Sequence, residues 1–494
     1  MTSITSIFIL YLLRFTYLIG VSATDNNHDD NVVKTYSIPD GIAIMDSYTI
    51  RARAANSATS NLVSSYQVLA AEANITSGAG IYHNMSVAYF DFSGTVHLSI
   101  TYNNGPIQNA TVRPLSYGIK PSVSGNVVSF SLHRPRNIVV EVNGNIWDVL
   151  NLMTNPLETD MPDPSDPDVL YFGPGINNGS ATAMQYIQDG LLNVPSNKIL
   201  YLAGGGVLTT IVQFNNVTNS QLRGRGVVKS SGGNMQVGNS TDIIVRDVIQ
   251  FNSGLVIGSS KRVLVSGLRS FTWAGNGDGM DLFCDQDVVV ENVFHRNSDD
   301  NVAIYQHRDN WYGDSKNITI RDSSLWADYA HPINIGTHGN TQNPETMDGI
   351  KIENIDILDH REYQLWYQGC IAINAGDSNM IQNIHVENIR VENFRHGQLV
   401  NLRVMDNTMY NTSPGRGIKN VYIKDMVYNG NHSLTSLVLG YDQEHNITNV
   451  VFEGLEINGL TIWDGMQKPA WYKESDYIPM FVNEHVFNIS FLQR

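Results

Sequence analysis

Two short segments of the chain bring together residue types that can move protons. They read NGDGMDLF (276–283) and NSDDNVAIYQ (297–306), and each places aspartate just before an apolar run typical of a strand. Together they hold these carboxylates: Asp278, Asp281, Asp299 and Asp300. Because crowded carboxylates repel one another, the pKa of one rises and that group stays protonated near neutrality. A neutral acid beside an ionised carboxylate is what hydrolysis of a glycosidic bond requires.

The two segments align with two later ones as successive strands of one sheet. The aligned strands read GMDLF (279–283), NVAIY (301–305), PINIG (332–336) and CIAIN (370–374). In this alignment Asp278 and Asp300 take equivalent positions on neighbouring strands, ~4.8 Å apart. Asp299 projects beside Asp300, and Asp281 lies on the strand itself. His331 enters from the next strand, so the alignment predicts one cluster of side chains.

A structural role is the alternative interpretation of these aspartates. Aspartate at a turn commonly caps backbone amides, and a single Asp-Asp pair would indicate no more than that. Two such segments in register, joined by a histidine, favour catalysis.

The coils that must position this cluster also contain a repeated strand–turn phrase. It occurs as IVRDV (244–248), LVSGL (264–268), VVENV (289–293), TIRDS (319–323), KIENI (351–355), HVENI (385–389), YIKDM (422–426) and VFEGL (451–455). Each copy is a short strand followed by Asp, Asn or Gly, which tolerate a left-handed backbone. The variable spacing, 20 to 37 residues, predicts a right-handed parallel β-helix with loops of different length. A leucine-rich repeat would need helical segments, and a propeller would need regular blades of ~40–45 residues.

The part of the chain before the repeats has a different pattern. Residues 32–158 alternate apolar and polar residues between Asn-Gly or Gly-Asn turns, which predicts an antiparallel β-sandwich. The Pro- and Asp-rich stretch DMPDPSDPD indicates a linker over 159–170. We therefore expect an all-β protein whose catalytic β-helix covers 171–494.

Residues 1–23 resemble a secretory signal peptide with small residues at its end, although an uncleaved anchor is the competing interpretation. Eleven N-x-[ST] sequons also favour a secreted glycoprotein: Asn74, Asn84, Asn109, Asn178, Asn216, Asn239, Asn317, Asn411, Asn431, Asn446 and Asn488. Cys284 and Cys370 are too few for a disulfide framework, and buried free thiols are expected, with a single bridge as the alternative. No motif indicates zinc, and we expect no cofactor.

The composition limits the partners. The formal net charge of −16 argues against nucleic acid and against an anionic membrane surface, and it weakly disfavours a polyanionic substrate. After cleavage of the signal peptide, no remaining segment has the ~20 apolar residues of a membrane span. The oligomeric state cannot be inferred from the sequence.

Three segments carry a resemblance to a known family. NGDGMDLF, SDDNVAIYQ and HPINIGTHG resemble the active-site segments of pectinase-clan β-helix glycosidases, which include polygalacturonases (family 28) and the dextranase/isopullulanase family 49. The spacing of the carboxylates is similar to the polygalacturonase pattern. The sandwich–linker–helix layout and the segments YAHPINIG and GIKIENIDILDHREY are most similar to family 49.

The resemblance implies inverting hydrolysis by single displacement. Asp299 would be the general acid, while Asp278 and Asp300 would hold the attacking water. Asp281 would orient the site or tune Asp278. His331 would match the active-site histidine and hydrogen-bond Asp299 or a sugar hydroxyl, with a packing role as the alternative interpretation.

One departure bears on the substrate. Polygalacturonases carry an Arg-x-Lys strand that grips a uronate carboxylate, whereas the corresponding strand here is CIAIN, with Ala372 and Asn374 at the two positions. An alanine and an amide cannot neutralise a uronic acid. Lys351 lies one strand too early, and Arg361 would serve only if its loop folded back. We expect a neutral, dextran-like α-glucan as substrate, with a pectic chain as the alternative.

Sugar rings stack on aromatic side chains. The candidates for substrate binding are Trp273, Tyr305, Trp311, Tyr312, Trp366 and Tyr367, together with His338 beyond a strand end. Two rival functions remain, a pectate-type lyase and a non-catalytic glycan-binding β-helix. The first would need a basic Arg or Lys, and the second has no use for crowded carboxylates.

Overall fold

The computed structural model describes residues 31–73, 80–177, 183–230, 232–467 and 480–494. Nearly every element within them is a strand; the exceptions are two short 3₁₀ helices, η1 (Leu115–Tyr117) and η2 (Met184–Tyr186). None of the helices in these ranges has the length and apolar character needed to cross a membrane. The predicted signal peptide, 1–23, lies outside the described residues.

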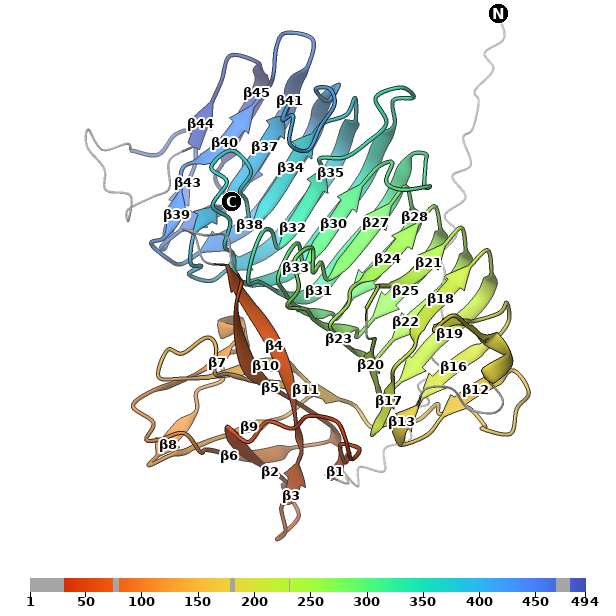
Figure 1. Cartoon of the computed structure of the whole chain (residues 1–494). Helices are drawn as coiled ribbons and strands as arrows, with labels where there is room; N and C mark the ends of the chain where they lie inside the picture. Colours follow the sequence, from red (N-terminus) through yellow and green to blue (C-terminus); the bar gives the residue numbers. More distant parts are fainter. Residues whose placement is uncertain (1–30, 74–79, 178–182, 231, 468–479) are drawn as a thin grey trace, which may run out of the picture.

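Two sheets packed face to face form the N-terminal part of the molecule (Figure 1). The inner sheet contains β1 (Val32–Thr35), β4 (Ser65–Ala73), β5 (Gly80–Ser93), β7 (Ala110–Arg113), β10 (Asn137–Val142) and β11 (Leu150–Asn155). The outer sheet contains β2 (Tyr48–Ala54), β3 (Asn61–Val63), β6 (Val96–Tyr102), β8 (Ser122–Ser124) and β9 (Val127–Leu132). One pairing departs from the antiparallel expectation, because β11 runs parallel to β5. The long connection between these two strands allows this pairing.

Two long parallel sheets wind through the rest of the described chain as a right-handed β-helix (Figure 1). The shorter contains β14 (Ile187–Gln188), β15 (Leu191–Asn193), β18 (Ile211–Asn215), β21 (Met235–Gly238), β24 (Leu255–Gly258), β27 (Met280–Phe283), β30 (Val302–Tyr305), β32 (Ile333–Gly336), β34 (Ile371–Ala375), β37 (Val400–Val404), β40 (Ser436–Leu439) and β44 (Met480–Val482). The predicted all-β fold is confirmed.

The longer sheet covers two sides of each coil. Its strands are β12 (Val169–Phe172), β13 (Gly175–Asn177), β16 (Ile199–Leu202), β17 (Gly206–Leu208), β19 (Thr218–Gly224), β20 (Val227–Lys229), β22 (Thr241–Arg246), β23 (Ile249–Phe251), β25 (Lys261–Ser266), β26 (Arg269–Phe271), β28 (Gln286–Glu291), β29 (Phe294–Asn297), β31 (Ser315–Ala327), β33 (Thr346–Asp359), β35 (Met380–Val391), β38 (Gly417–Tyr428), β41 (Asn446–Glu453), β42 (Leu455–Ile457), β43 (Leu460–Ile462) and β45 (Val486–Leu492). A small pair, β36 (Gly397–Gln398) and β39 (Ser433–Leu434), lies beside it.

The repeated phrase accounts for the stacking of the longer sheet. Its copies pair in register from β22 to β41. The residue after each strand has a left-handed backbone, as at Asp247 (φ 64°) and Asn292 (φ 53°). Asp and Asn adopt this conformation at low cost, so the chain can turn the same corner in every coil. Alternate Val, Ile and Leu side chains point inward and form one continuous apolar core.

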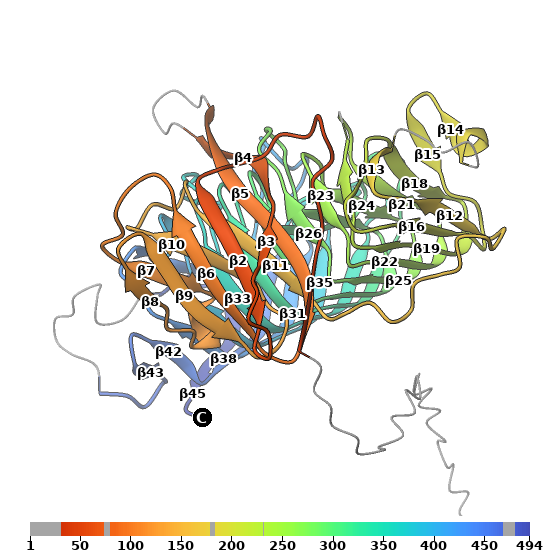
Figure 2. The ribbon, with the colours of Figure 1, turned by 90° about the horizontal axis from the view of Figure 1, so that it is seen from below.

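The inner sheet of the sandwich packs against the β-helix, and the outer sheet lies on its far side (Figure 2). A shared apolar cluster joins β4, β5, β10 and β11 to the helix side chains Phe251, Phe271, Phe294 and Trp326. Buried ion pairs also cross this interface: Arg113 Nε to Glu392 at 2.7 Å, and Arg225 Nε to Asp91 at 3.1 Å. Each of these charges is buried together with a partner of opposite charge, so the sandwich and the β-helix form a closely fitted unit.

Candidate active site

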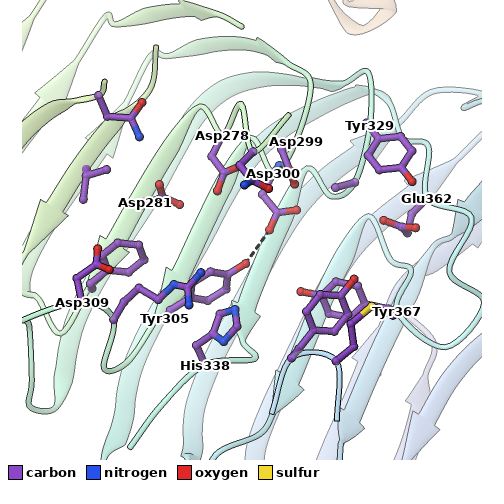
Figure 3. Close-up of a pocket in the computed structure, with 18 of the residues that line it drawn as sticks. Asp278, Asp281, Asp299, Asp300, Tyr305, Asp309, Tyr329, His338, Glu362 and Tyr367 are labelled. Atoms are coloured by element: carbon purple, nitrogen blue, oxygen red, sulfur yellow. Dashed lines mark hydrogen bonds between the residues drawn. The ribbon is translucent and has the colours of Figure 1, made fainter. Parts of the chain in front are cut away.

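A cavity of about 640 Å³ lies over the outward face of the shorter helix sheet (Figure 3). Its lining includes six carboxylates: Asp278, Asp281, Asp299, Asp300, Asp309 and Glu362. The remaining lining residues are Asn234, Val256, Asn276, Phe283, Tyr305, Arg308, Tyr329, Ala330, His338, Gln364, Tyr367, Met409 and Tyr410. Strands β27 and β30 form the floor, and the loops after β31, β33 and β37 form the far wall.

The predicted alignment of the carboxylate segments is confirmed. Met280 pairs with Val302 and Val302 with Ile333, so Asp278, Asp300 and His331 precede successive strands at equivalent positions. Backbone hydrogen bonds continue the stacking, since the Gly279 N–H donates to the Asp300 carbonyl at 2.8 Å. Figure 3 shows Asp278, Asp299 and Asp300 next to one another at one edge of the cavity.

Asp300 is the most firmly held of these carboxylates. One oxygen accepts hydrogen bonds from the His331 ring Nδ1 at 2.7 Å and the His331 backbone N–H at 3.0 Å. The other accepts from the Asn334 amide and the Tyr305 hydroxyl, both at 2.9 Å. A carboxylate has about four lone-pair sites, so these donors fill the acceptor capacity of Asp300.

The charges of Asp300 and His331 stabilise each other. Burial alone would raise the pKa of Asp300, but His331 and the hydrogen bonds to the carboxylate lower it below its ordinary value. Burial alone would lower the pKa of His331, but Asp300 raises it to about 9. Near neutrality the pair is therefore an imidazolium and a carboxylate.

The position of His331 departs from the sequence-based expectation. The ring bonds to Asp300 rather than to Asp299, and its Nε2 donates to the Tyr367 carbonyl at 2.8 Å. It is fully buried, so it cannot reach a sugar hydroxyl.

The other three central carboxylates have the opposite tendency. The pKa of Asp299 is raised well above its ordinary value, first by burial and then by the charges of the neighbouring Asp278 and Asp300. Burial and the neighbouring Asp281 and Asp300 do the same for Asp278. Burial raises the pKa of Asp281 to about 7, against the lowering effect of its hydrogen bond with Asp278. The cavity thus combines one fixed anion with carboxyl groups that hold protons near neutrality.

The predicted aromatic residues separate into two groups. Tyr305 lines the cavity and Trp273 borders it. The Trp273 indole donates a hydrogen bond to Asn252 at 3.1 Å. Tyr82 of the sandwich contacts the Trp273 ring edge-on. Trp273 lines an adjoining cavity of about 500 Å³, which shares Asn234 and Asn276 with the first.

Trp311 and Tyr312 lie outside the cavity lining. Trp311 is buried against Phe283, with ring centroids 5.7 Å apart, and against Gly258. Tyr312 is exposed and stacks on His307. The Trp311 loop therefore folds back onto the coil, because the missing side chain at Gly258 leaves room for the indole ring.

Two other aromatic candidates border the later coils. Tyr367 lines the cavity and stacks on Tyr410, with ring centroids 4.6 Å apart, while Trp366 is exposed. His338 also lines the cavity and meets Tyr305 edge-on; burial lowers its pKa to about 4, so it is neutral.

The motifs alone missed several lining residues. Arg308 and Asp309 follow β30, and Glu362 and Gln364 come from the loop between β33 and β34. Tyr329, Met409 and Tyr410 come from two further loops. The length of the segment from Asp359 to Ile371 is the signal that could have indicated a cavity wall, since long loops on a β-helix lie outside the coils.

The strand that corresponds to the Arg-x-Lys strand of polygalacturonases is buried in this protein. Ala372 and Asn374 on β34 are fully buried. Arg361 turns toward the sandwich, where its Nη1 lies 3.7 Å from Glu72, and Lys351 lies on the other sheet. No lysine lines the described cavity, and Arg308 is its one arginine.

The cysteines and the candidate metal ligands lie outside the lining of the cavity. Cys284 and Cys370 are free and buried, as expected. Among the described residues, one group of potential metal ligands has its donor atoms within 4.8 Å: Glu353, His385 and Glu387. It lies on the longer sheet, away from the cavity lining, and Lys424 already pairs with Glu387 at 2.8 Å.

Comparison with known proteins adds sequence and fold similarity. The family model described as "Glycosyl hydrolases family 28" matches residues 202–470, more than half of the chain. The structure of Dex49A from Penicillium minioluteum aligns with a TM-score of 0.64 at 13% identity, covering 92% of this chain and 96% of that one. A family 28 exopolygalacturonase from Yersinia enterocolitica aligns with a TM-score of 0.45 at 10% identity, over 80% and 96% of the respective chains. No curated protein sequence matches.

Proposed function

This chain belongs to the glycosyl hydrolases family 28. From the lining of its carboxylate cavity we propose that it hydrolyses a neutral polysaccharide with inversion at the anomeric carbon. It is a pectinase-clan β-helix glycoside hydrolase, as the carboxylate segments indicate. Its sandwich-plus-helix layout is similar to the fold of Dex49A. We further propose that the protein is secreted, which its N-terminal 23 residues support.

One observation carries the proposed reaction. Carboxylates from two neighbouring coils line one cavity, and their surroundings give them different pKa values: that of Asp299 is raised well above its ordinary value, that of Asp281 is raised to about 7, and that of Asp300 is lowered. Pairs of carboxyl groups with separated pKa values are how glycosidases obtain an acid and a base at the same pH.

Asp299 is the proposed general acid. Its raised pKa keeps the proton that the leaving glycosidic oxygen must receive. The ionised Asp300 next to it supports that protonated state, and the Asp300 N–H donates to the Asp299 carboxyl at 3.0 Å, which fixes its orientation.

Asp278 is the proposed base. Its own pKa is raised, so it acts together with Asp281, whose pKa of about 7 lets it ionise near neutrality and accept the Asp278 proton. The ionised pair takes a proton from water, the water oxygen bonds to the anomeric carbon, and the glycosidic C–O bond breaks as Asp299 protonates the departing oxygen. The sequence predicts that Asp278 and Asp300 share this water, but four donors already occupy Asp300. The geometry therefore favours Asp278, with Asp281 as its hydrogen-bonded partner.

The charge of the cavity supports a neutral substrate. Arg308 is the one arginine in the described lining and His338 is neutral, so a uronate would find only a single ion-pair partner there. The far wall offers Tyr329, Glu362 and Gln364, which can hydrogen-bond sugar hydroxyls, and Tyr410, which can stack on a ring.

A galacturonan is the second candidate. Membership of family 28 favours it, and Arg308 could pair with a single uronate carboxylate on the side of Asp281. In that case Arg308 would replace the missing Arg-x-Lys strand.

A reducing-sugar assay separates the two candidates. The purified protein is incubated with dextran, pullulan and polygalacturonate, and NMR then determines the anomeric configuration of the first product. We expect release from a neutral glucan with inverted configuration. If reducing sugar is released from polygalacturonate alone, the substrate is a pectic chain and the proposed neutral substrate is wrong. If no glycan releases reducing sugar, the proposed hydrolysis is contradicted.

A further inference from the structure

The outer sheet of the sandwich contains a second hollow, far from the carboxylates. It is a trough of about 590 Å³ on the solvent side of the sheet. Six of its lining residues come from three neighbouring strands: Arg51 and Arg53 from β2, His97 and Ser99 from β6, and Ser129 and Ser131 from β9. We refer to this feature, defined by these six residues, as the outer trough.

The strand register produces the trough. Arg51 pairs with Ser99 and Ser99 with Ser129 in one row, while Arg53, His97 and Ser131 form the next. Alternate residues point to opposite faces, so these six share the face that the core does not use. Their neighbours, such as Ile50 and Ile100, are buried between the two sheets. Short serine side chains between long arginine side chains leave the hollow.

The cations of the trough are not neutralised by the protein. Arg51 has no hydrogen-bond or ion-pair partner within the described part of the chain. Arg53 donates only to the Ser57 carbonyl, at 3.0 Å, and His97 contacts the Ser131 hydroxyl at 2.8 Å. Of the described residues that line the trough, none is acidic.

The sandwich that carries the trough differs in net charge from the chain as a whole. Residues 32–158 contain seven Lys and Arg and seven Asp and Glu, whereas the chain has a net charge of −16. The sandwich therefore has a formal net charge of zero, so an anionic polymer meets less repulsion there than the net charge of the chain would suggest. None of its described acidic residues lines the trough, and several are paired, as Asp91 is with Arg225.

The chemistry of the lining selects the ligand. A guanidinium group binds a carboxylate with two parallel hydrogen bonds, and serine hydroxyls suit sugar hydroxyls. Arg51 and Arg53 are two residues apart on one strand, so their Cα atoms are ~6.7 Å apart. Two fixed cations in a row suit a polymer with repeated charges better than a single small anion. No exposed aromatic ring lines the described trough, which disfavours a neutral sugar.

We propose that the outer trough binds a carboxylate-bearing polysaccharide, a uronate chain, and so holds the enzyme on an acidic glycan while the cavity acts on its own substrate. The trough lies on the outer sheet and the cavity on the β-helix, and the inner sheet separates the outer sheet from the β-helix (Figure 2). This proposal does not depend on the reaction in the cavity.

Affinity electrophoresis in gels that contain polygalacturonate tests the proposal. The full chain is used with the Asp299→Asn substitution, so that the probe is not degraded. In this background Arg51→Ser with Arg53→Ser removes the two cations of the trough, and Lys34→Ser with Arg134→Ser removes two exposed cations elsewhere on the sandwich. Gels with dextran measure the response to a neutral chain, and gels with heparin measure the response to sulfate groups.

We expect polygalacturonate to retard the parent protein, less so as salt rises. The trough variant should lose affinity by about tenfold, whereas the control variant should stay close to the parent. Equal retardation of the trough variant and its parent would overturn the proposal, as would retardation by heparin alone or an equal response to dextran. The double variant Arg51→Lys with Arg53→Lys should have an affinity between those of the parent and the trough variant, because it retains the charge but loses the paired hydrogen bonds.

Discussion

In the cavity of the β-helix, six carboxylates share the walls with one arginine; in the outer trough of the sandwich, two arginines and a histidine stand among serines. Four of the cavity carboxylates, Asp278, Asp281, Asp299 and Asp300, are buried or half-buried and bonded to one another or to neighbouring donors. The trough cations are exposed or half-buried, and Arg51 has no described partner. Enclosure changes proton affinity and so suits catalysis, whereas exposure preserves charge and suits reversible binding.

The largest effect should come from the proposed base. Asp278→Asn retains the shape of the side chain but cannot accept the proton from water, so kcat should fall by about 10²–10⁴-fold. Initial-rate kinetics on the substrate found in the reducing-sugar assay measure this. Asp309→Asn is the matched control in the same cavity and should change kcat far less. Similar losses in the two variants would show that general acidity of the cavity, not the position of Asp278, supports activity.

The second effect concerns stability at the junction of the two regions. Arg296 is fully buried, donates to both oxygens of Asp328 and to the Ile146 carbonyl, and lies 4.1 Å from the Trp326 ring centroid. Arg296→Met leaves Asp328 with Arg395 as its remaining ion-pair partner. The free energy of unfolding should fall by about 3–5 kcal/mol, measured by denaturant titration. A loss below about 1 kcal/mol would mean that Arg395 alone satisfies Asp328.

The third effect is on the pH dependence of stability. The pKa of His331 is raised to about 9 from 6.5, so its stabilising contribution is complete below pH 6.5 and is lost as pH rises through 9. The pKa of Asp300 is lowered, so its contribution is present above its ordinary value of 3.8 and is lost as pH falls through the folded-state pKa. The raised pKa values of Asp278 and Asp299 also make stability fall as pH rises.

We therefore expect Tm to decline between pH 6.5 and 9, measured by calorimetry in buffers of matched ionic strength. His331→Gln should reduce this slope, because glutamine does not titrate. A variant with the parent slope would contradict the buried imidazolium.

The smallest effect should come from the trough. Arg51→Ser should change the free energy of unfolding by no more than about 0.5 kcal/mol, because an exposed side chain without a described partner contributes little to folding. The same denaturant titration measures it next to Arg296→Met. A loss above 1 kcal/mol would indicate a structural role for Arg51 and weaken the assignment of the trough to binding.

One property of the β-helix allowed both the fold and the centre of the site to be predicted from the sequence. In a β-helix the two-residue alternation of side chains sets the register, so aligning the apolar residues of β27, β30 and β32 also aligned Asp278, Asp300 and His331. The repeated turn residues set the corners of the coils.

Features that depend on loop paths could not be predicted in this way. Trp311 was expected to meet sugar but packs over Gly258, because loop conformation depends on tertiary contacts. Glu362, Tyr410 and Arg308 reach the cavity from loops that share no register with the coils. The bonding of His331 to Asp300 depends on ring orientation, which the alignment does not specify.

The account depends most on Asp299 as the proton donor. The decisive measurement compares Asp299→Asn with the parent protein in two assays, kcat on the identified glycan and the Kd of an oligosaccharide by calorimetry. We expect kcat to fall by about 10²–10⁴-fold while Kd changes by less than about threefold, because an amide still fills the space but has no proton to give. Near-parental turnover in this variant would contradict the proposed mechanism.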